Sequence, residues 1–148
     1  MQPFPHHYDV EAAATVAGDV MIGGRSLPPL ASASPAEFGG PGTRWSPETL
    51  LVAAVAACFV MTFRAMAMTA KLSWTSLDCD VVGTLDRVDH EIRFTEFHLR
   101  VRLQIPEDTN EGQAQRLIEK VERNCLVANS LKARVHLDRT VEVARNAA

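Results

Sequence analysis

The chain has 148 residues, of which 47% are hydrophobic and 22% charged, and its formal net charge is −3. This length can bury a hydrophobic core without disulfides or metals, so we expect a single domain over residues 1–148, with loosely ordered tails at 1–7 and 144–148. A slightly acidic chain without a basic block gives no reason to expect binding to nucleic acid or to a membrane surface.

The N-terminal segment MQPFPHHYDV lacks the basic and apolar regions of a signal peptide, which predicts a cytoplasmic protein. The most apolar run, Leu50 to Phe63, is shorter than the roughly 20 residues of a membrane span and is followed by Arg64. We therefore expect a buried helix rather than a membrane segment. In the reducing cytosol, a disulfide between any of the three cysteines is expected to be transient and catalytic.

Residues 8–45 are rich in turn signals, which predict two or three short strands and a mobile loop; the signals are Gly23-Gly24, Pro28-Pro29 and Gly39 to Gly42. A helix is predicted to begin at Ser46, because serine can cap its N-terminus and because Pro47 and Glu48 suit its first turn. The apolar pattern of this helix continues to about Lys71.

Two segments with alternating apolar residues, 73–85 and 91–105, predict an antiparallel hairpin through the turn RVDHE. In the second segment the pattern shifts phase once, near Phe97. The residues predicted to face inward are Ile92, Phe94, Phe97, Leu99, Val101, Leu103 and Ile105. Residues 109–124 predict a second helix and 131–143 a final strand. This order of elements predicts an α+β fold without repeats or a second domain.

Each cysteine has a structural as well as a chemical interpretation. Cys58 lies mid-helix among alanines, where a free cysteine commonly packs as a small apolar residue. Cys125 lies at the end of the second predicted helix, where a thiol is more often accessible to other molecules than in the middle of a helix. Cys79 is flanked by Asp78 and Asp80, whose carboxylates disfavour a thiolate. The cysteines lack metal-binding spacing and the histidines are scattered along the sequence, so we expect no metal ion and no cofactor.

Two motifs taken together carry a family resemblance. The first is SPETLLVAAVAACF at residues 46–59, and the second is EKVERNCLVANSL at 119–131. The pair resembles the OsmC/Ohr family of thiol peroxidases, whose pattern is Asn/Ser-Pro-Glu, small and apolar residues, Ala-Ala-Cys-Phe, and a second cysteine at the end of a later helix. The resemblance covers about residues 8–143. It implies an OsmC-like α+β fold, with antiparallel sheets around a long buried central helix, in an intertwined homodimer with active sites at the subunit interface.

The resemblance also implies an enzyme, a cysteine-based peroxidase that reduces organic hydroperoxides and is regenerated by a dithiol reductant. By position, Cys58 corresponds to the peroxidatic cysteine and Cys125 to the resolving cysteine. Glu48 corresponds to the glutamate that the family sets against an arginine. Apolar residues that could line the peroxide pocket, or equally belong to the core, are Phe59, Met61, Phe63 and Leu126.

This sequence departs from the family pattern at two points. Gly18 occupies the place of the family arginine, which leaves Arg44, just before the helix, as the preferred candidate cation and Arg25 as a second candidate. The segment CLVANSL replaces the more familiar Cys-Pro. These departures keep an alternative function open: a dimer of the same fold that is inactive or weakly active and binds an apolar small molecule.

The spacing of Glu48 and Cys58 adds a geometric expectation. One continuous helix would separate these two residues by about 15 Å along its axis and by roughly 80° around it. They cannot share a site within a single straight helix. We therefore predict that Glu48 serves Cys58 of the partner subunit.

Overall fold

The computed structural model describes residues 2–144, which divide into two compact units at the boundary between Leu51 and Val52. Three strands precede the long helix, and a hairpin, two helices and a strand follow it, which confirms the α+β class. Residues 2–7 form neither helix nor strand, and residues 145–148 of the predicted C-terminal tail lie outside the described part of the chain. The single domain over 1–148 stays a prediction.

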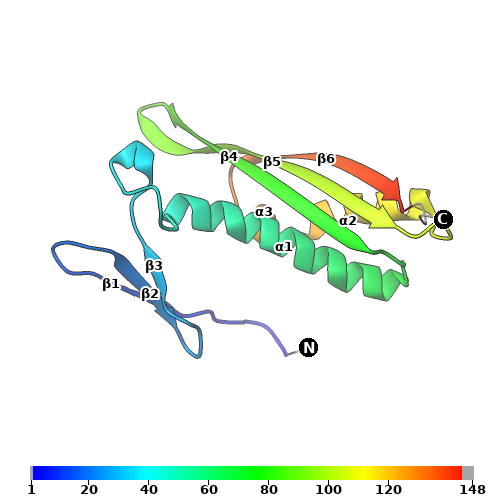
Figure 1. The fold of residues 1–148 in the computed structure, drawn as a ribbon, viewed down its shortest axis with the longest axis horizontal. Coiled ribbons are helices and arrows are strands. Elements are labelled where there is room, and N and C mark those ends of the chain that lie inside the picture. Colours follow the sequence, from blue (N-terminus) through cyan, green and yellow to red (C-terminus); the bar gives the residue numbers. More distant parts are fainter. Residues whose placement is uncertain (1, 145–148) are drawn as a thin grey trace. The chain divides into compact units, whose positions relative to one another are not determined.

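The first unit contains a small antiparallel sheet in the order β1-β2-β3 (Figure 1). Its strands are β1 (Val10–Ala13), β2 (Val20–Gly24) and β3 (Leu30–Ser32), as the turn signals predicted, and a 3-10 helix, η1 (Ala36–Phe38), follows. All four residues of β1 are exposed.

Helix α1 (Pro47–Ala70) is a single helix of 24 residues and has the predicted cap. The Ser46 Oγ accepts a hydrogen bond from the Thr49 backbone N–H at 3.2 Å, and the Ser46 N–H donates to the Thr49 Oγ1 at 2.8 Å. Two N–H groups that a helix start would leave unpaired are thereby satisfied. The helix ends one residue before Lys71, which has a positive φ of 51°.

The second unit contains a sheet in the order β4-β5-β6, with β4 at Ser76–Val88, β5 at Glu91–Ile105 and β6 at Arg134–Val143. The predicted hairpin is confirmed: Val88 pairs with Glu91, and Asp89 and His90 have positive φ values of 51° and 69°, as a two-residue hairpin turn requires. Thr84 pairs with Glu96 and Leu85 with Phe94, so Thr95 is an extra residue on β5. This β-bulge is the physical cause of the predicted phase shift.

Strand β6 corrects one expectation about the sheets. It runs parallel to β5, with His98 opposite His136 and Leu99 opposite Leu137, whereas we expected antiparallel pairing throughout. The reason is the connection: the chain returns through α2 (Glu111–Asn124) and the four-residue α3 (Leu126–Asn129), a crossover that allows a parallel strand. The sequence did not predict α3.

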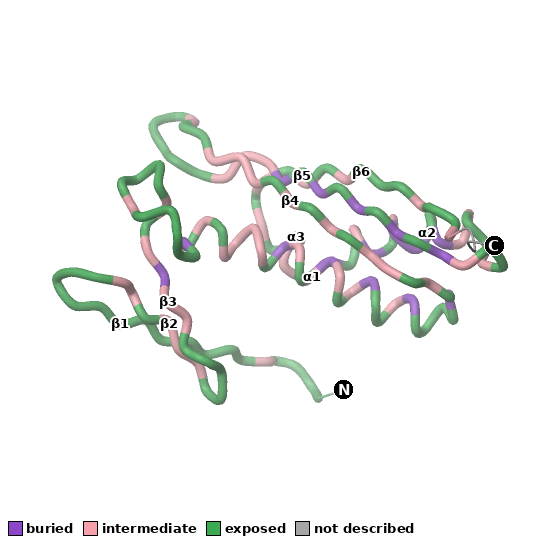
Figure 2. The backbone as a smooth tube through the Cα atoms, viewed as in Figure 1, coloured by how far each residue is buried: buried purple, intermediate pink, exposed green. Residues whose placement is uncertain are grey.

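The core of the second unit lies between one face of this sheet and the helices. Helix α1 contributes the buried stripe Val55, Phe59, Phe63 and Ala67, and α2 contributes Ala114, Leu117, Ile118 and Val121. Figure 2 shows the buried positions alternating with exposed ones along β5. Phe97, Leu99, Val101, Leu103 and Ile105 are buried as predicted, whereas Ile92, near the hairpin end, is 51% exposed and was wrongly expected to face inward.

Candidate active site

The thiols of Cys58 and Cys125 lie close enough for each to affect the pKa of the other. Cys58 is half-buried near the middle of α1, and Cys125 is buried where α2 ends. Both belong to the unit that begins at Val52, so its packing brings together two cysteines that are far apart in the sequence. Both are free thiols, which is the reduced state of such a pair.

Burial by itself raises the pKa of Cys58, but hydrogen bonds to its sulfur outweigh that effect and hold the pKa below its ordinary value. The largest of them come from the backbone N–H of Val127 and from the Cys125 thiol. The Thr62 hydroxyl, with its Oγ1 3.9 Å from the sulfur, and the backbone N–H of Leu126 contribute less. Each of these groups stabilises the thiolate, which is the nucleophilic form of cysteine.

Cys125 is held by its backbone at the junction of the two helices. Its N–H donates to the Glu122 carbonyl at 3.4 Å, and its carbonyl accepts from the Asn129 N–H at 2.9 Å. Burial raises the pKa of the Cys125 thiol to about 11, and its hydrogen bond to Cys58 and the charge of Cys58 add to the rise. Cys125 is therefore protonated at neutral pH and can donate a hydrogen bond to the Cys58 thiolate.

Cys79 is a third thiol, and it is less acidic than Cys58. It lies on β4 opposite Val101, and burial raises its pKa to about 11, with smaller contributions from Asp80 and Cys125. The sequence predicted the direction from the flanking carboxylates, but burial is the larger cause.

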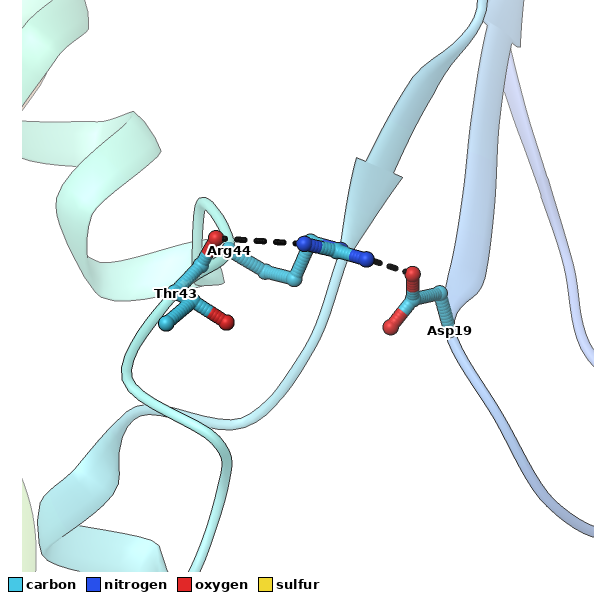
Figure 3. A network of polar contacts seen from close by, with 3 residues as sticks. All are labelled: Asp19, Thr43 and Arg44. Carbon is cyan, nitrogen blue, oxygen red and sulfur yellow. Dashed lines mark hydrogen bonds and ion pairs between the residues drawn. The ribbon is translucent and has the colours of Figure 1, made fainter.

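Arg44 and Glu48 are not joined by an ion pair in the part of the chain that the structure describes. The Arg44 Nε donates to the Asp19 Oδ2 at 2.8 Å, and its Nη1 donates to the Thr43 carbonyl at 3.4 Å (Figure 3). Among residues 2–144, the Glu48 Oε2 is buried and has no hydrogen-bond partner. Arg25, the second candidate cation, is exposed in the turn after β2.

Glu48 and Cys58 lie on the same unbroken helix, as the spacing argument assumed. The axial separation of about 15 Å therefore applies to them. The structure brings Cys58 to Cys125 within the second unit, whereas Glu48 and Arg44 belong to the first unit.

Three donors to Cys58 were not predicted from the sequence. Thr62 is four residues after Cys58, a spacing that places both on one helix face, so this contact could have been found. The backbone N–H groups of Leu126 and Val127 have no sequence signature. Of the four apolar pocket candidates, Phe59 and Phe63 are fully buried core residues, whereas Met61 is 67% exposed and Leu126 is 75% exposed.

Comparison with known proteins identifies the family. The family model described as OsmC-like protein matches residues 40–139. The chain belongs to the OsmC-like family. This OsmC-like chain is 34% identical over 93 residues to the protein named peroxiredoxin OsmC of Escherichia coli (strain K12), a match that covers 63% of this chain. It spans 64% of the length of that relative.

Solved OsmC-like structures share the fold. An OsmC-like protein of unknown function from Vibrio cholerae superposes with a TM-score of 0.85 at 14% identity, over 92% of this chain and 100% of the other. An organic hydroperoxide resistance protein OsmC from Legionella pneumophila gives 0.73 at 25% identity, over 95% and 100%. The predicted family and OsmC-like fold are thereby confirmed.

Proposed function

We propose that this OsmC-like protein is a cysteine-based peroxidase that reduces organic hydroperoxides, with Cys58 as the peroxidatic and Cys125 as the resolving residue. The observation that carries this proposal is the pairing of the two thiols, in which hydrogen bonds lower the pKa of Cys58. The relatives named peroxiredoxin and organic hydroperoxide resistance protein support the same class of reaction.

In the first step the Cys58 thiolate attacks the distal oxygen of the hydroperoxide. A sulfur–oxygen bond forms, the O–O bond breaks, and the alkoxide leaves and takes up a proton to become an alcohol. The sulfur is oxidised to a sulfenic acid while the peroxide is reduced.

In the second step the Cys125 sulfur attacks the sulfenic acid, a disulfide forms and water leaves. Cys125 must lose its proton for this attack. Burial raises the pKa of Cys125 to about 11, and the negative charge of Cys58 is one of the further causes. Because the sulfenic acid is neutral, oxidation of Cys58 removes that contribution at the step where Cys125 has to react. A dithiol reductant, which a reducing compartment such as the cytoplasm supplies, then regenerates both thiols by exchange.

The surroundings of the pair suit an apolar peroxide. Met61 lies one helical turn after Cys58, and Leu126 directly follows Cys125; both side chains are mostly exposed. An alkyl or fatty-acid chain could pack against these side chains at the edge of the proposed subunit interface, and hydrogen peroxide has no apolar part that could do so. We therefore expect organic hydroperoxides to react faster than hydrogen peroxide.

A second copy of the chain is the proposed cover for the outer face of α1. By length and composition α1 could cross a membrane, but only 22% of its most apolar stretch is buried within the chain. Small or apolar residues recur every three or four positions on the exposed side: Ala54, Ala57, Met61, Ala65 and Met68. Arg64 is also exposed within the helix, and a charged side chain is costly in lipid. Packing against another protein surface is therefore the better explanation, and we propose a homodimer.

The dimer would also explain Glu48. Glu48 is half-buried, and its Oε2, which is buried within the single subunit, has no hydrogen-bond partner among residues 2–144; this is costly, and rotation of the side chain toward a partner subunit would relieve the cost. We propose that Glu48 completes the site around Cys58 of the partner subunit.

Subunit complementation tests this arrangement. Glu48→Gln and Cys58→Ser proteins, each inactive alone, should recover activity when mixed dimers form, because one site then contains an intact Cys58 and the partner's Glu48. If both residues act within one subunit, mixing restores nothing. Met68→Glu should convert the dimer to a monomer in analytical ultracentrifugation, and Lys120→Glu, on the exposed side of α2, is its matched control.

Stoichiometric oxidation tests the chemistry. One equivalent of cumene hydroperoxide should give a Cys58–Cys125 disulfide by mass spectrometry, and Cys125→Ser should stop at a Cys58 sulfenic acid that dimedone traps. Cys79→Ser, the matched control, should still form the disulfide. The proposal is wrong if Cys58 is not oxidised or if Cys58→Ser keeps full turnover.

One observation supports the alternative of an inactive dimer that binds an apolar molecule. Arg44, the preferred candidate cation, is paired with Asp19 rather than with Glu48. If the oxidation experiment fails while an apolar fluorescent probe binds the dimer with micromolar or better affinity, this alternative replaces the peroxidase.

A further inference from the structure

A second group of side chains that could carry chemistry lies on the open face of the C-terminal sheet. Glu96 and His98 are alternate residues of β5, and His136 of β6 lies directly opposite His98 in the parallel register. Helices α1 and α2 cover the other face of β5, where the odd-numbered residues from Phe97 to Ile105 are buried. The three side chains therefore point away from the cysteine pair.

The three residues converge closely. The imidazole rings of His98 and His136 stack with centroids 4.6 Å apart and an interplanar angle of 21°. The His136 Nε2 lies 3.5 Å from the Glu96 Oε2. One possible ligand atom from each residue lies within 4.8 Å of the other two.

We propose that Glu96, His98 and His136 bind a divalent first-row transition-metal ion such as Zn²⁺, with water in the remaining coordination positions. Two imidazole nitrogens and one carboxylate oxygen are a donor set that zinc uses in proteins. Such a site is distinct from the thiol chemistry proposed above, and its ligands come from the opposite face of the sheet.

To bind the ion, the ligand atoms have to move closer together and the stacked imidazole rings have to turn so that a nitrogen of each faces the metal. Ligand atoms around tetrahedral zinc lie about 3.4 Å apart, since each is about 2.0–2.2 Å from the metal. The side chains of His136 and Glu96 are 45% and 40% exposed, which leaves them room to rotate on the solvent side. Two neighbouring parallel strands fix the backbone positions of all three ligands.

The surrounding charges permit a cation. Arg134 lies opposite Glu96 across the strand pair, and the next pair along is Arg100 with Asp138, so basic and acidic side chains both border the site. Exposed Val82 of β4 is opposite His98 and offers no competing ligand. Because the site is open to water, we expect fast exchange and weaker binding than in a closed structural zinc site.

Calorimetric titration with ZnCl₂ tests the site. The full chain with Cys58→Ser is used, so that the cysteine pair cannot bind the metal, and one ion per chain should bind saturably. Even outer-shell partners contribute about 10- to 100-fold to metal affinity, so His98→Gln or His136→Gln should weaken binding by at least about tenfold. Glu96→Gln should weaken it as well.

His90→Gln is the matched control, because this exposed histidine lies in the hairpin turn, outside the cluster. It should leave the affinity unchanged. The Co²⁺ spectrum of the Cys58→Ser protein should lack thiolate charge-transfer bands, and zinc should raise the melting temperature of this protein but not that of a His98→Gln/His136→Gln double variant. The proposal is overturned if binding does not saturate, if both single histidine variants bind normally, or if His90→Gln weakens binding equally.

Discussion

Gly83 of β4 lies where α1 packs on the sheet, and a methyl group there has no room. A Cβ at this position would be 2.8 Å from the Val52 Cγ2, 2.9 Å from the Phe94 Cε1 and 3.1 Å from the Phe97 Cε1. Two of these distances are shorter than side-chain contacts allow, so the helix or a ring must shift. Phe97 is fully buried and stacks on Phe94 with centroids 5.1 Å apart, so a shift of either ring disturbs the other. We predict that Gly83→Ala lowers the free energy of unfolding by about 1–3 kcal/mol.

Urea unfolding followed by far-UV circular dichroism measures this loss. Gly23→Ala is the matched control, because its Cβ would meet only the flexible end of exposed Glu11, with the Oε1 at 3.2 Å. It should be neutral or stabilise by up to about 1 kcal/mol, since a strand glycine loses more entropy on folding than alanine. Val52→Ala removes the nearest methyl group, so it should cost less in the Gly83→Ala protein than in the parent, as a double-mutant cycle reports. A Gly83→Ala protein as stable as the parent would refute the packing argument, and so would purely additive costs.

Three further predictions concern the thiols. Cys125→Ala removes a hydrogen-bond donor and should raise the pKa of Cys58. A hydrogen bond is worth ~0.5–1.5 kcal/mol, so iodoacetamide alkylation of Cys58 at neutral pH should slow about two- to tenfold. Cys125→Ser keeps a donor, and equal slowing in both variants would contradict this cause. Thr62→Val should raise the pKa of Cys58 by removing a smaller contribution, so it should slow alkylation less than Cys125→Ala, while Thr62→Ser should match the parent. Burial raises the pKa of Cys79 from 9.0 to about 11, so between these pH values the folded thiol stays neutral while the unfolded one ionises. The free energy of unfolding should therefore fall as pH rises from 9.0 to about 11. Cys79→Ser should reduce this fall in urea titrations at several pH values, and an unchanged dependence on pH would exclude Cys79 as a cause.

Much of the fold could be predicted because its signals are local. The cap at Ser46 and the apolar run after it define α1, and alternation defines β5 from Glu91 to Ile105 as the structure has it. The phase shift was predicted from the alternation of apolar residues in the sequence, although only strand pairing identifies Thr95 as the bulged residue. The direction of β6 could not be predicted, because its alternating pattern is the same for parallel and antiparallel pairing. Helix α3 has four residues, too few for a periodic pattern.

The residues of the candidate site could also be predicted in part, and their spatial arrangement could not. Position and family resemblance selected Cys58 and Cys125, and the packing of α1 against the junction of α2 and α3 then placed the two thiols together. The donors around Cys58 depend on that packing and on backbone direction, which residue types do not encode. His98 and His136 lie opposite each other in the parallel register of β5 and β6, and the sequence predicted neither the direction nor the register of that pairing.

The groups that lower the pKa of Cys58 within one subunit are hydrogen-bond donors rather than cations. Within residues 2–144, no lysine, arginine or histidine is among the groups that lower the pKa of Cys58; backbone N–H groups, the Cys125 thiol and the Thr62 hydroxyl do so. The CLVANSL segment even adds a donor, because Leu126 has a backbone N–H and a proline in its place would have none. Within one subunit, a guanidinium is therefore not what lowers the pKa of Cys58. A cation would instead stabilise the oxygen that becomes an alkoxide as the O–O bond breaks. A chain without such a cation should therefore keep a reactive thiol but reduce the peroxide more slowly.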